Sequence, residues 1–122
     1  MSHDAVRWMK AFAAQAISLS QANQWQPLVD VYRTDSGWLI KYELAGVRPE
    51  DVSLTVDGGR LTLRGTRRDC CIKETCCHYR MEISYSHFER TVELPEHLDT
   101  ARLTSEFWHG MLLVRVEKED AR

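Results

Sequence analysis

Residues 52–65 read VSLTVDGGRLTLRG, and this stretch decides the fold class. Apolar and polar residues alternate on both sides of Asp57-Gly58-Gly59, as they do in half-buried antiparallel strands. Glycine adopts the positive φ angles of a tight turn without steric cost, so this tripeptide predicts a hairpin. The stretch therefore indicates two antiparallel strands joined by a short turn.

The same alternation recurs on both sides of the hairpin, separated by turn-forming glycine and proline residues. It is found in Trp38-Ile40-Tyr42, Phe88-Arg90-Val92-Leu94 and Leu112-Val114-Val116. Several short strands at turn spacing, without helices between them, are typical of an antiparallel β-sandwich. We therefore predict an all-β fold, an immunoglobulin-like sandwich that begins near Pro27.

The N-terminal segment follows a different period. Residues 4–19 carry apolar side chains at helical spacing, which predicts a short amphipathic helix. The larger apolar side chains of this segment are Val6, Trp8, Met9, Phe12 and Ile17. The polar residues 18–26 indicate a hinge, so we divide the chain into an N-terminal helical arm (1–26), a sandwich domain (27–118) and a C-terminal stub (119–122).

Length and charge narrow the class of protein. A chain of 122 residues is long enough for one domain with a core. Its formal net charge of −2 provides no field that attracts nucleic acid. Its apolar runs are too short to span a membrane, and its N-terminus lacks the features of a secretory signal. These observations predict a cytoplasmic protein that binds neither nucleic acid nor a membrane through a spanning segment.

Catalytic motifs are absent from the sequence. It has no glycine-rich phosphate loop, no Gly-x-Ser-x-Gly elbow and no His-Glu-x-x-His helix. Cys77 and His78 are neighbours, but adjacent side chains on an extended chain point apart, which disfavours a Cys-His nucleophile. We therefore expect a protein that is not an enzyme.

Four segments, in order along the chain, resemble the small heat-shock protein family, whose members share the alpha-crystallin domain. They are residues 43–52 (ELAGVRPEDV), 61–65 (LTLRG), 88–95 (FERTVELP) and 103–114 (LTSEFWHGMLLV). The resemblance covers roughly residues 27–116 and is to the bacterial type. It implies an ATP-independent holdase chaperone of the stress response, which binds unfolding client proteins and prevents their aggregation.

The resemblance also implies where partners bind. It implies a groove for clients or partners between Val52, Leu54 and Val56 on one strand and Leu103, Ser105 and Phe107 on another. The apolar side chains of the N-terminal arm would form a second, adaptable client-binding surface. For the arm, docking on its own sandwich is an equally weighted alternative.

The segment between Gly65 and Pro95 has the length that carries an exchanged strand in bacterial and plant members. The resemblance implies a homodimer made by mutual strand addition, with the exchanged strand formed by His78, Tyr79, Arg80, Met81 and Glu82. After Val116 the sequence contains no Ile-x-Ile or Ile-x-Val motif, which the family uses to build large shells. We therefore expect a dimer or a small oligomer.

A cysteine cluster is the least family-like feature. It consists of Cys70, Cys71, Cys76 and Cys77, followed directly by His78. Thiolates and an imidazole suit zinc, although the spacing is not that of a zinc finger. The nearby cations Arg67, Arg68 and Lys73 would favour thiolates and hence oxidation, and inert thiols are the third possibility. We expect no cofactor apart from a possible zinc ion at this cluster. The alternative to a holdase is a co-chaperone-like or redox- or metal-responsive binding module on the same fold.

Overall fold

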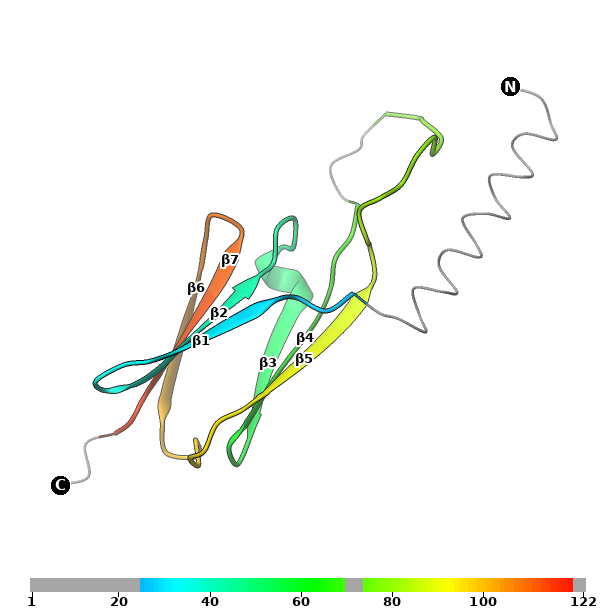
Figure 1. The fold of residues 1–122 in the computed structure, drawn as a ribbon. Coiled ribbons are helices and arrows are strands. Elements are labelled where there is room, and N and C mark those ends of the chain that lie inside the picture. The colour runs from blue at the N-terminus through cyan, green and yellow to red at the C-terminus, as the bar shows by residue number, and fades with distance from the viewer. Residues whose placement is uncertain (1–24, 70–73, 120–122) are drawn as a thin grey trace.

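The computed structural model describes residues 25–69 and 74–119, which form seven strands and one short 3-10 turn. Figure 1 shows the strands arranged in two packed layers. The strands are β1 (Val29–Arg33), β2 (Gly37–Glu43), β3 (Val52–Asp57), β4 (Arg60–Thr66), β5 (His87–Glu93), β6 (Arg102–Trp108) and β7 (Met111–Glu117), and the turn is η1 (Pro49–Asp51).

Two antiparallel sheets build the sandwich. Sheet A has the strand order β1-β2-β7-β6, and sheet B has the order β3-β4-β5. All their pairings are antiparallel. The predicted all-β sandwich is confirmed, and each sheet ends in two edge strands: β1 and β6 in sheet A, β3 and β5 in sheet B.

The core lies between the sheets, where alternate residues of the central strands point inward. The largest fully or almost fully buried side chains include Ile40, Tyr42, Leu61, Leu63, Phe88, Val114 and Val116. Burying one aliphatic or aromatic side chain of this size contributes roughly 1.5–3 kcal/mol. The alternation in the sequence thus predicted the inward faces correctly, because each strand has one face covered by the opposite sheet.

The hairpin predicted for residues 52–65 forms between β3 and β4. Asp57 pairs with Arg60, so Gly58 and Gly59 make the turn between β3 and β4. Gly58 has a φ of +62°, which glycine adopts without strain. A side chain at Gly59 would meet the carbonyl oxygen of Leu94 at 2.5 Å, so the turn packs closely against the segment after β5.

Beyond the seven strands, two segments of the chain bear on the predicted binding surfaces. The helix predicted over residues 4–19 lies outside the described residues. The described residues of the β4–β5 connection, which runs from residue 67 to residue 86, project past the end of both sheets (Figure 1). Within residues 25–69 and 74–119, no helix has the length and hydrophobicity needed to cross a membrane.

Candidate functional site

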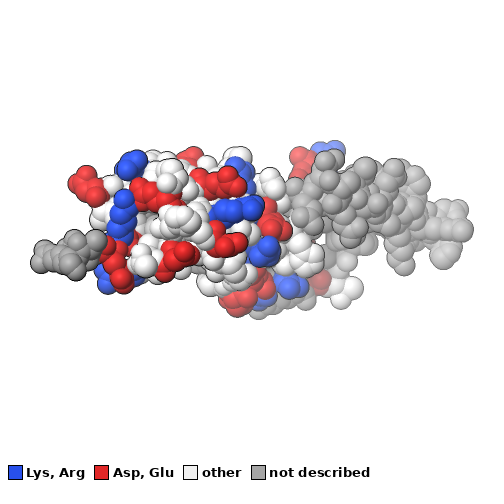
Figure 2. All heavy atoms as spheres, turned by 90° about the horizontal axis from the view of Figure 1, so that it is seen from below, with Lys and Arg blue, Asp and Glu red and all other residues white. Residues whose placement is uncertain are grey.

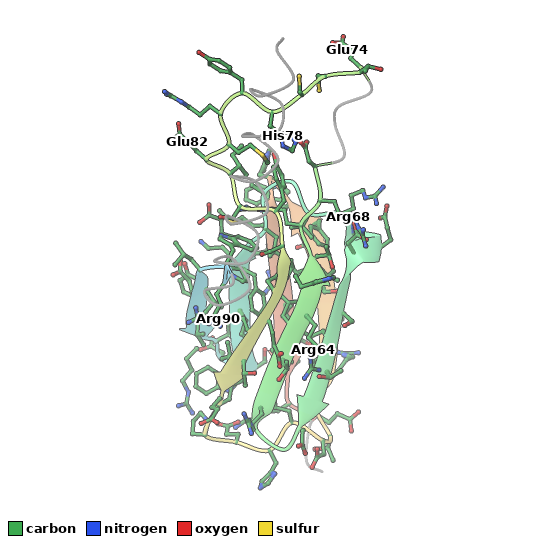
Figure 3. All side chains as sticks on the ribbon, turned by 90° about the vertical axis from the view of Figure 1, so that its right-hand side faces the viewer. Arg64, Arg68, Glu74, His78, Glu82 and Arg90 are labelled. Atoms are coloured by element: carbon green, nitrogen blue, oxygen red, sulfur yellow. The ribbon has the colours of Figure 1, made fainter. Side chains whose placement is uncertain are left out.

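The residues of the expected groove lie on edge strands of opposite sheets. Figure 3 shows β3 and β6 along one side of the sandwich and β1 and β5 along the other. We call the groove residues the edge site, which consists of Val52, Leu54 and Val56 of β3 and Leu103, Ser105 and Phe107 of β6.

The edge site combines apolar side chains with open strand edges. Its five apolar side chains are half-buried and pack against the core. In the described part of the chain, no strand pairs with the outer side of β3 or of β6. Backbone donors and acceptors on such an edge are free to pair with another chain. The edge site can therefore offer apolar contact and backbone hydrogen bonds at the same place.

Ser105 is the one polar residue of the edge site. It is exposed and stands between the half-buried Leu103 and Phe107 on the same face of β6. Its side chain is smaller than either neighbour and ends in a hydroxyl. The groove role that the sequence predicted for these residues stays a prediction.

The opposite side of the sandwich has a second open edge at β1. Val31 pairs with the fully buried Ile40, yet Val31 itself is 42% exposed. Among the described strands, only β2 pairs with β1. The inward face of β1 is therefore incompletely covered in the single chain.

The expected exchange segment lies in the projecting connection. In the single chain His78–Glu82 form no strand, and Figure 3 shows Glu74 and Glu82 on the part that extends beyond the sheets. The apolar side chains of this segment are exposed at every second position, at Tyr79, Met81 and Ile83. One face of a strand would carry all three. Strand exchange itself stays a prediction, since it needs a second chain.

A contact that the sequence did not predict ties the base of this connection to the end of the N-terminal arm. Arg67 donates from its backbone N–H to the Ser86 carbonyl at 2.9 Å and from Nε to the Ser84 carbonyl at 2.7 Å. Its guanidinium carbon lies 3.8 Å from the centre of the Trp25 ring, in cation–π geometry. Trp25 in turn packs edge-on against Phe88, with ring centres 5.3 Å apart. Arg67 thus holds both ends of the connection and the start of the sandwich together.

Arg67 and Arg68, which the sequence analysis placed near the cysteines, contact other groups in the structure. Burial lowers the pKa of Arg67, and the nearby Tyr85 and Glu43 partly oppose this shift. Arginine nevertheless stays charged at neutral pH. Its charge is directed to Trp25 and Ser84, and that of Arg68 to Asp51 at 3.4 Å.

The cysteine cluster is only partly within the described residues. Cys76 and Cys77 are free and exposed, whereas Cys70 and Cys71 lie outside the described residues. Within residues 25–69 and 74–119, no three His, Cys, Asp or Glu side chains are arranged to hold a metal ion. Both the zinc hypothesis and the redox hypothesis therefore remain predictions.

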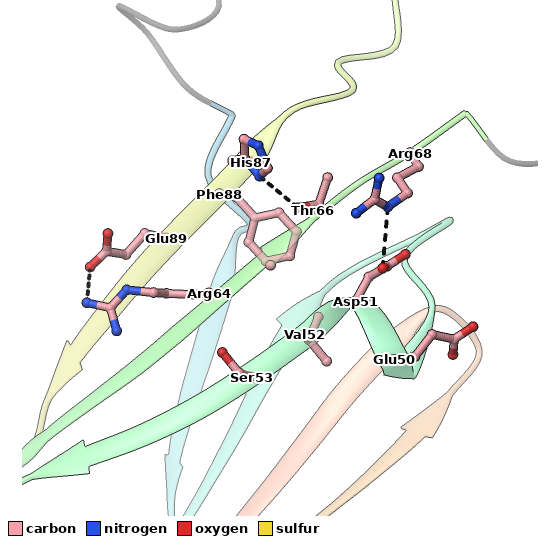
Figure 4. A pocket seen from close by; sticks show the side chains of 11 residues that line it. Glu50, Asp51, Val52, Ser53, Arg64, Thr66, Arg68, His87, Phe88 and Glu89 are labelled. Carbon is pink, nitrogen blue, oxygen red and sulfur yellow. Dashed lines mark hydrogen bonds and ion pairs between the residues drawn. The ribbon is translucent and has the colours of Figure 1, made fainter.

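A shallow polar pocket of about 510 Å³ opens at the upper end of sheet B (Figure 4). Its charged side chains are already engaged with one another or with neighbours. The contacts are Arg64–Glu89 at 3.0 Å, Arg68–Asp51 at 3.4 Å, Glu50–Arg48 at 3.5 Å and Thr66–His87 at 2.7 Å. Exposed ion pairs of this kind contribute little to stability, but each charged side chain that lines the pocket has a partner.

The charged surface is mixed. Figure 2 shows lysine and arginine interspersed with aspartate and glutamate over the face in view. Interspersed charges of both signs favour solubility and do not steer a polyanion to the surface.

Comparison with known proteins finds the same family in a family model and in the relatives with similar sequences. The profile of the Hsp20/alpha crystallin family matches residues 30–122. Small heat shock protein C2 of Rickettsia felis is 26% identical over 94 residues, which cover 77% of this chain and 61% of the relative. Against this relative and small heat shock protein C4 of the same organism, the chain spans about three fifths of the relative's length, 61% and 58%.

Solved structures of small heat shock proteins have the same fold as this chain. Heat shock protein 16.0 from Schizosaccharomyces pombe superposes with a TM-score of 0.69 at 29% identity, covering 78% of this chain and 88% of that one. The hspA protein from Xanthomonas axonopodis gives a TM-score of 0.62 at 31% identity, covering 78% and 95%. The sandwich is thus the alpha-crystallin domain, and the chain belongs to the Hsp20/alpha crystallin family of small heat shock proteins.

Proposed function

We propose that this protein is an ATP-independent holdase, which binds unfolding proteins through apolar surfaces and prevents their aggregation. The observation that carries this proposal is the edge site, where five half-buried apolar side chains lie beside two open strand edges. Unfolding proteins expose apolar segments and unpaired strands. An extended client segment along β3 or β6 would cover the side chains and pair with the backbone together.

Holding of this kind requires no reaction. Burial of apolar area contributes roughly 25 cal/mol per Å², and backbone pairing adds hydrogen bonds. Neither contribution needs nucleotide hydrolysis, a cofactor or a nucleophile. The proposed activity is therefore non-enzymatic and reversible, and it suits a stress-response protein of the cytoplasm.

Two copies of the chain would complete one another at the other side of the sandwich. In this proposal His78–Glu82 of one copy add a strand to the open edge of β1 in the second copy. The exposed Tyr79 and Met81 share one face of that strand, and Val31 is the incompletely covered apolar residue on β1. The proposed unit is a homodimer by mutual strand exchange or a small oligomer built from it.

The experiment is to heat a heat-labile client with the full chain, without ATP, and to separate the products by size-exclusion chromatography. We expect a soluble complex that contains both proteins, under reducing and oxidising conditions and with a chelator. If the client pellets in every condition and no complex elutes, the holdase proposal is wrong. If the complex forms only with oxidant, or is lost with chelator, the redox- or metal-responsive alternative takes its place.

A further inference from the structure

Two edge strands lie on the same side of the sandwich, β1 of sheet A and β5 of sheet B (Figure 3). In an antiparallel pair, every second residue directs its backbone N–H and C=O to the partner strand. The Arg67 N–H donates to the Ser86 carbonyl at 2.9 Å in the β4–β5 register, just before β5 begins. The even-numbered residues of β5 therefore direct these groups to β4. The odd-numbered residues direct theirs to the free edge, and they are His87, Glu89, Thr91 and Glu93.

The free edge of β5 is partly covered by the segment that leads into the sandwich. Residues 25–27, which we call the edge guard, lie beside β5 before the chain crosses to β1 (Figure 1). The Gln26 side chain donates from Nε2 to the outward carbonyl of Glu89 at 3.2 Å. Pro27 is fully buried and has no N–H to offer another strand. Its carbonyl accepts a hydrogen bond from Arg90 Nη1 at 3.3 Å.

The edge guard is anchored at both ends. Trp25 packs edge-on against Phe88, with ring centres 5.3 Å apart, and the Arg67 guanidinium carbon lies 3.8 Å from the Trp25 ring centre. Arg67 is held in turn by the Ser84 carbonyl at 2.7 Å. At the other end the buried Pro27 fixes the segment in the rim of the sandwich. The first half of the β5 edge is therefore covered by the chain itself.

The neighbouring edge of β1 has no such cover. The Thr34 N–H donates to the Gly37 carbonyl at 2.9 Å, directly after β1 ends. By the same alternation, β1 directs the backbone groups of Val29, Val31 and Arg33 away from β2. In the described part of the chain, no strand or side chain pairs with these outward groups. β1 therefore offers free donors and acceptors along its whole length.

We propose that the edge guard closes β5 to strand addition and thereby directs the incoming strand of a second copy to β1. Free backbone groups at a sheet edge pair with any extended chain, so an edge that must stay unpaired has to be covered. The direction to β1 rests on the homodimer proposed above, whereas the closure of β5 does not.

The rest of the β5 edge is poorly suited to pairing. Beyond the edge guard only the short stretch from Thr91 to Glu93 is left. Glu93 forms an exposed ion pair with Arg60 at 3.5 Å, and short edges that carry charged side chains resist the addition of a strand. A strand that covered more of β5 would have to displace Gln26 from the Glu89 carbonyl. The edge guard thus decides whether this edge is long enough to accept a partner.

The test is photo-crosslinking of the full chain with p-benzoylphenylalanine in place of Glu93, whose side chain is 73% exposed beside the β5 edge. Mixing isotope-labelled and unlabelled chains distinguishes crosslinks between chains from crosslinks within one chain. With the edge guard intact we expect few crosslinks between chains. The double variant Trp25→Ser with Gln26→Ala should raise them at least about fivefold, because it frees the Glu89 carbonyl and removes the ring that anchors the segment.

Two further variants make the test specific. Leu28→Ser removes an apolar side chain directly after the edge guard that is 70% exposed, and it should crosslink like the wild type. Thr91→Pro, added to the double variant, should return the crosslinks to nearly the wild-type yield. It removes an outward N–H from β5 and leaves the pairing with β4 intact. Crosslinks caused by general unfolding would not respond to this proline.

Three results would overturn the closure of β5: equal yields from the wild type and the double variant, an equal rise with Leu28→Ser, or a rise that persists with Thr91→Pro. Light scattering of the same samples reports the dimer separately. If the wild type is a monomer, the proposed homodimer and the direction of its strand to β1 are wrong, while the crosslinks still decide whether the edge guard closes β5.

Discussion

At the scale of single residues, Tyr42 is an exception in an otherwise apolar core. Its side chain is fully buried, and its hydroxyl has no hydrogen-bond partner among the described residues. Burial raises the pKa of Tyr42 to about 12, while the charge of Arg90 acts in the opposite direction. A buried hydroxyl without a partner costs about 1–3 kcal/mol.

We therefore predict that Tyr42→Phe stabilises the fold by about 1 kcal/mol at neutral pH, measured by urea unfolding. The folded-state pKa lies above the ordinary value of 10, so the folded state holds the phenol proton more tightly. The stability of the wild type then falls as the pH rises from about 10 to about 12. The phenylalanine variant has no phenol to ionise at this position, so it does not show this fall. The difference in the free energy of unfolding between Tyr42→Phe and the wild type should therefore widen in that range. A variant less stable than the wild type at neutral pH would show that the hydroxyl has a partner.

Residue-scale contacts also show where prediction from sequence stops. The alternating pattern predicted that Ile40, Tyr42 and Leu63 face one side of their strands, because it depends only on local geometry. The contact between Trp25 and Arg67 joins residues 42 positions apart and has no local signal. Only the folded chain brings them together.

At the scale of elements, close packing of β2 against β7 depends on a glycine. A Cβ atom at Gly37 would collide with the backbone carbonyl oxygen of Val116, which cannot move without shifting β7. Gly46 differs, because a Cβ atom there would contact nothing within 4 Å. Its φ of +79° is nevertheless unfavourable for a residue with a side chain.

The two glycines make a matched pair. Gly37→Ala should lower the free energy of unfolding by about 3 kcal/mol, because the strand pairing has to shift. Gly46→Ala should cost only about 1 kcal/mol, the strain of a positive φ for a residue with a side chain. Chemical denaturation of both variants measures the difference. Equal losses would mean that the β2–β7 approach is not as close as the structure shows.

The exchange segment gives the second element-scale prediction. The double variant Tyr79→Ser with Met81→Ser removes the apolar face of the proposed exchanged strand and should weaken the dimer at least about tenfold. Arg80→Ser changes the alternate face, where its ion pair to Glu82 at 3.9 Å is exposed, and should leave the dimer nearly unchanged. Light scattering coupled to size-exclusion chromatography over a range of concentrations gives both dissociation constants. A double variant that dimerises as well as Arg80→Ser would contradict exchange through this segment.

Elements were predicted unevenly, and the reasons are physical. The hairpin of β3 and β4 was predicted because its turn and both its strands carry strong local signals. The strand β1 was not singled out, since it has only five residues and is mostly exposed. The contact of the edge guard with β5 was not predicted, because Gln26 and Glu89 are 63 positions apart and nothing local marks them as partners.

At the scale of the whole molecule, apolar contact surfaces and polar surfaces are separated. The edge site lies along the β3–β6 side, the open edge of β1 lies along the other side, and the outer face of sheet B is polar. This arrangement keeps one face polar and leaves the incompletely covered apolar side chains along the two sides of the sandwich.

The most direct measurement is light scattering of a heat-labile client, warmed without ATP and with the wild type, Ser105→Glu or Thr104→Glu. Ser105 and Thr104 are adjacent and exposed on β6, but only Ser105 belongs to the edge site, so the charge is the same and only the face differs. We predict that the wild type and Thr104→Glu suppress aggregation near equimolar ratio and that Ser105→Glu suppresses it several-fold less. A client segment bound at the edge site would bury the added carboxylate without a partner, which is costly. If the wild type leaves the scattering of the client unchanged, the holdase account is contradicted. If the wild type suppresses scattering and the two variants act alike, clients do not bind at the edge site.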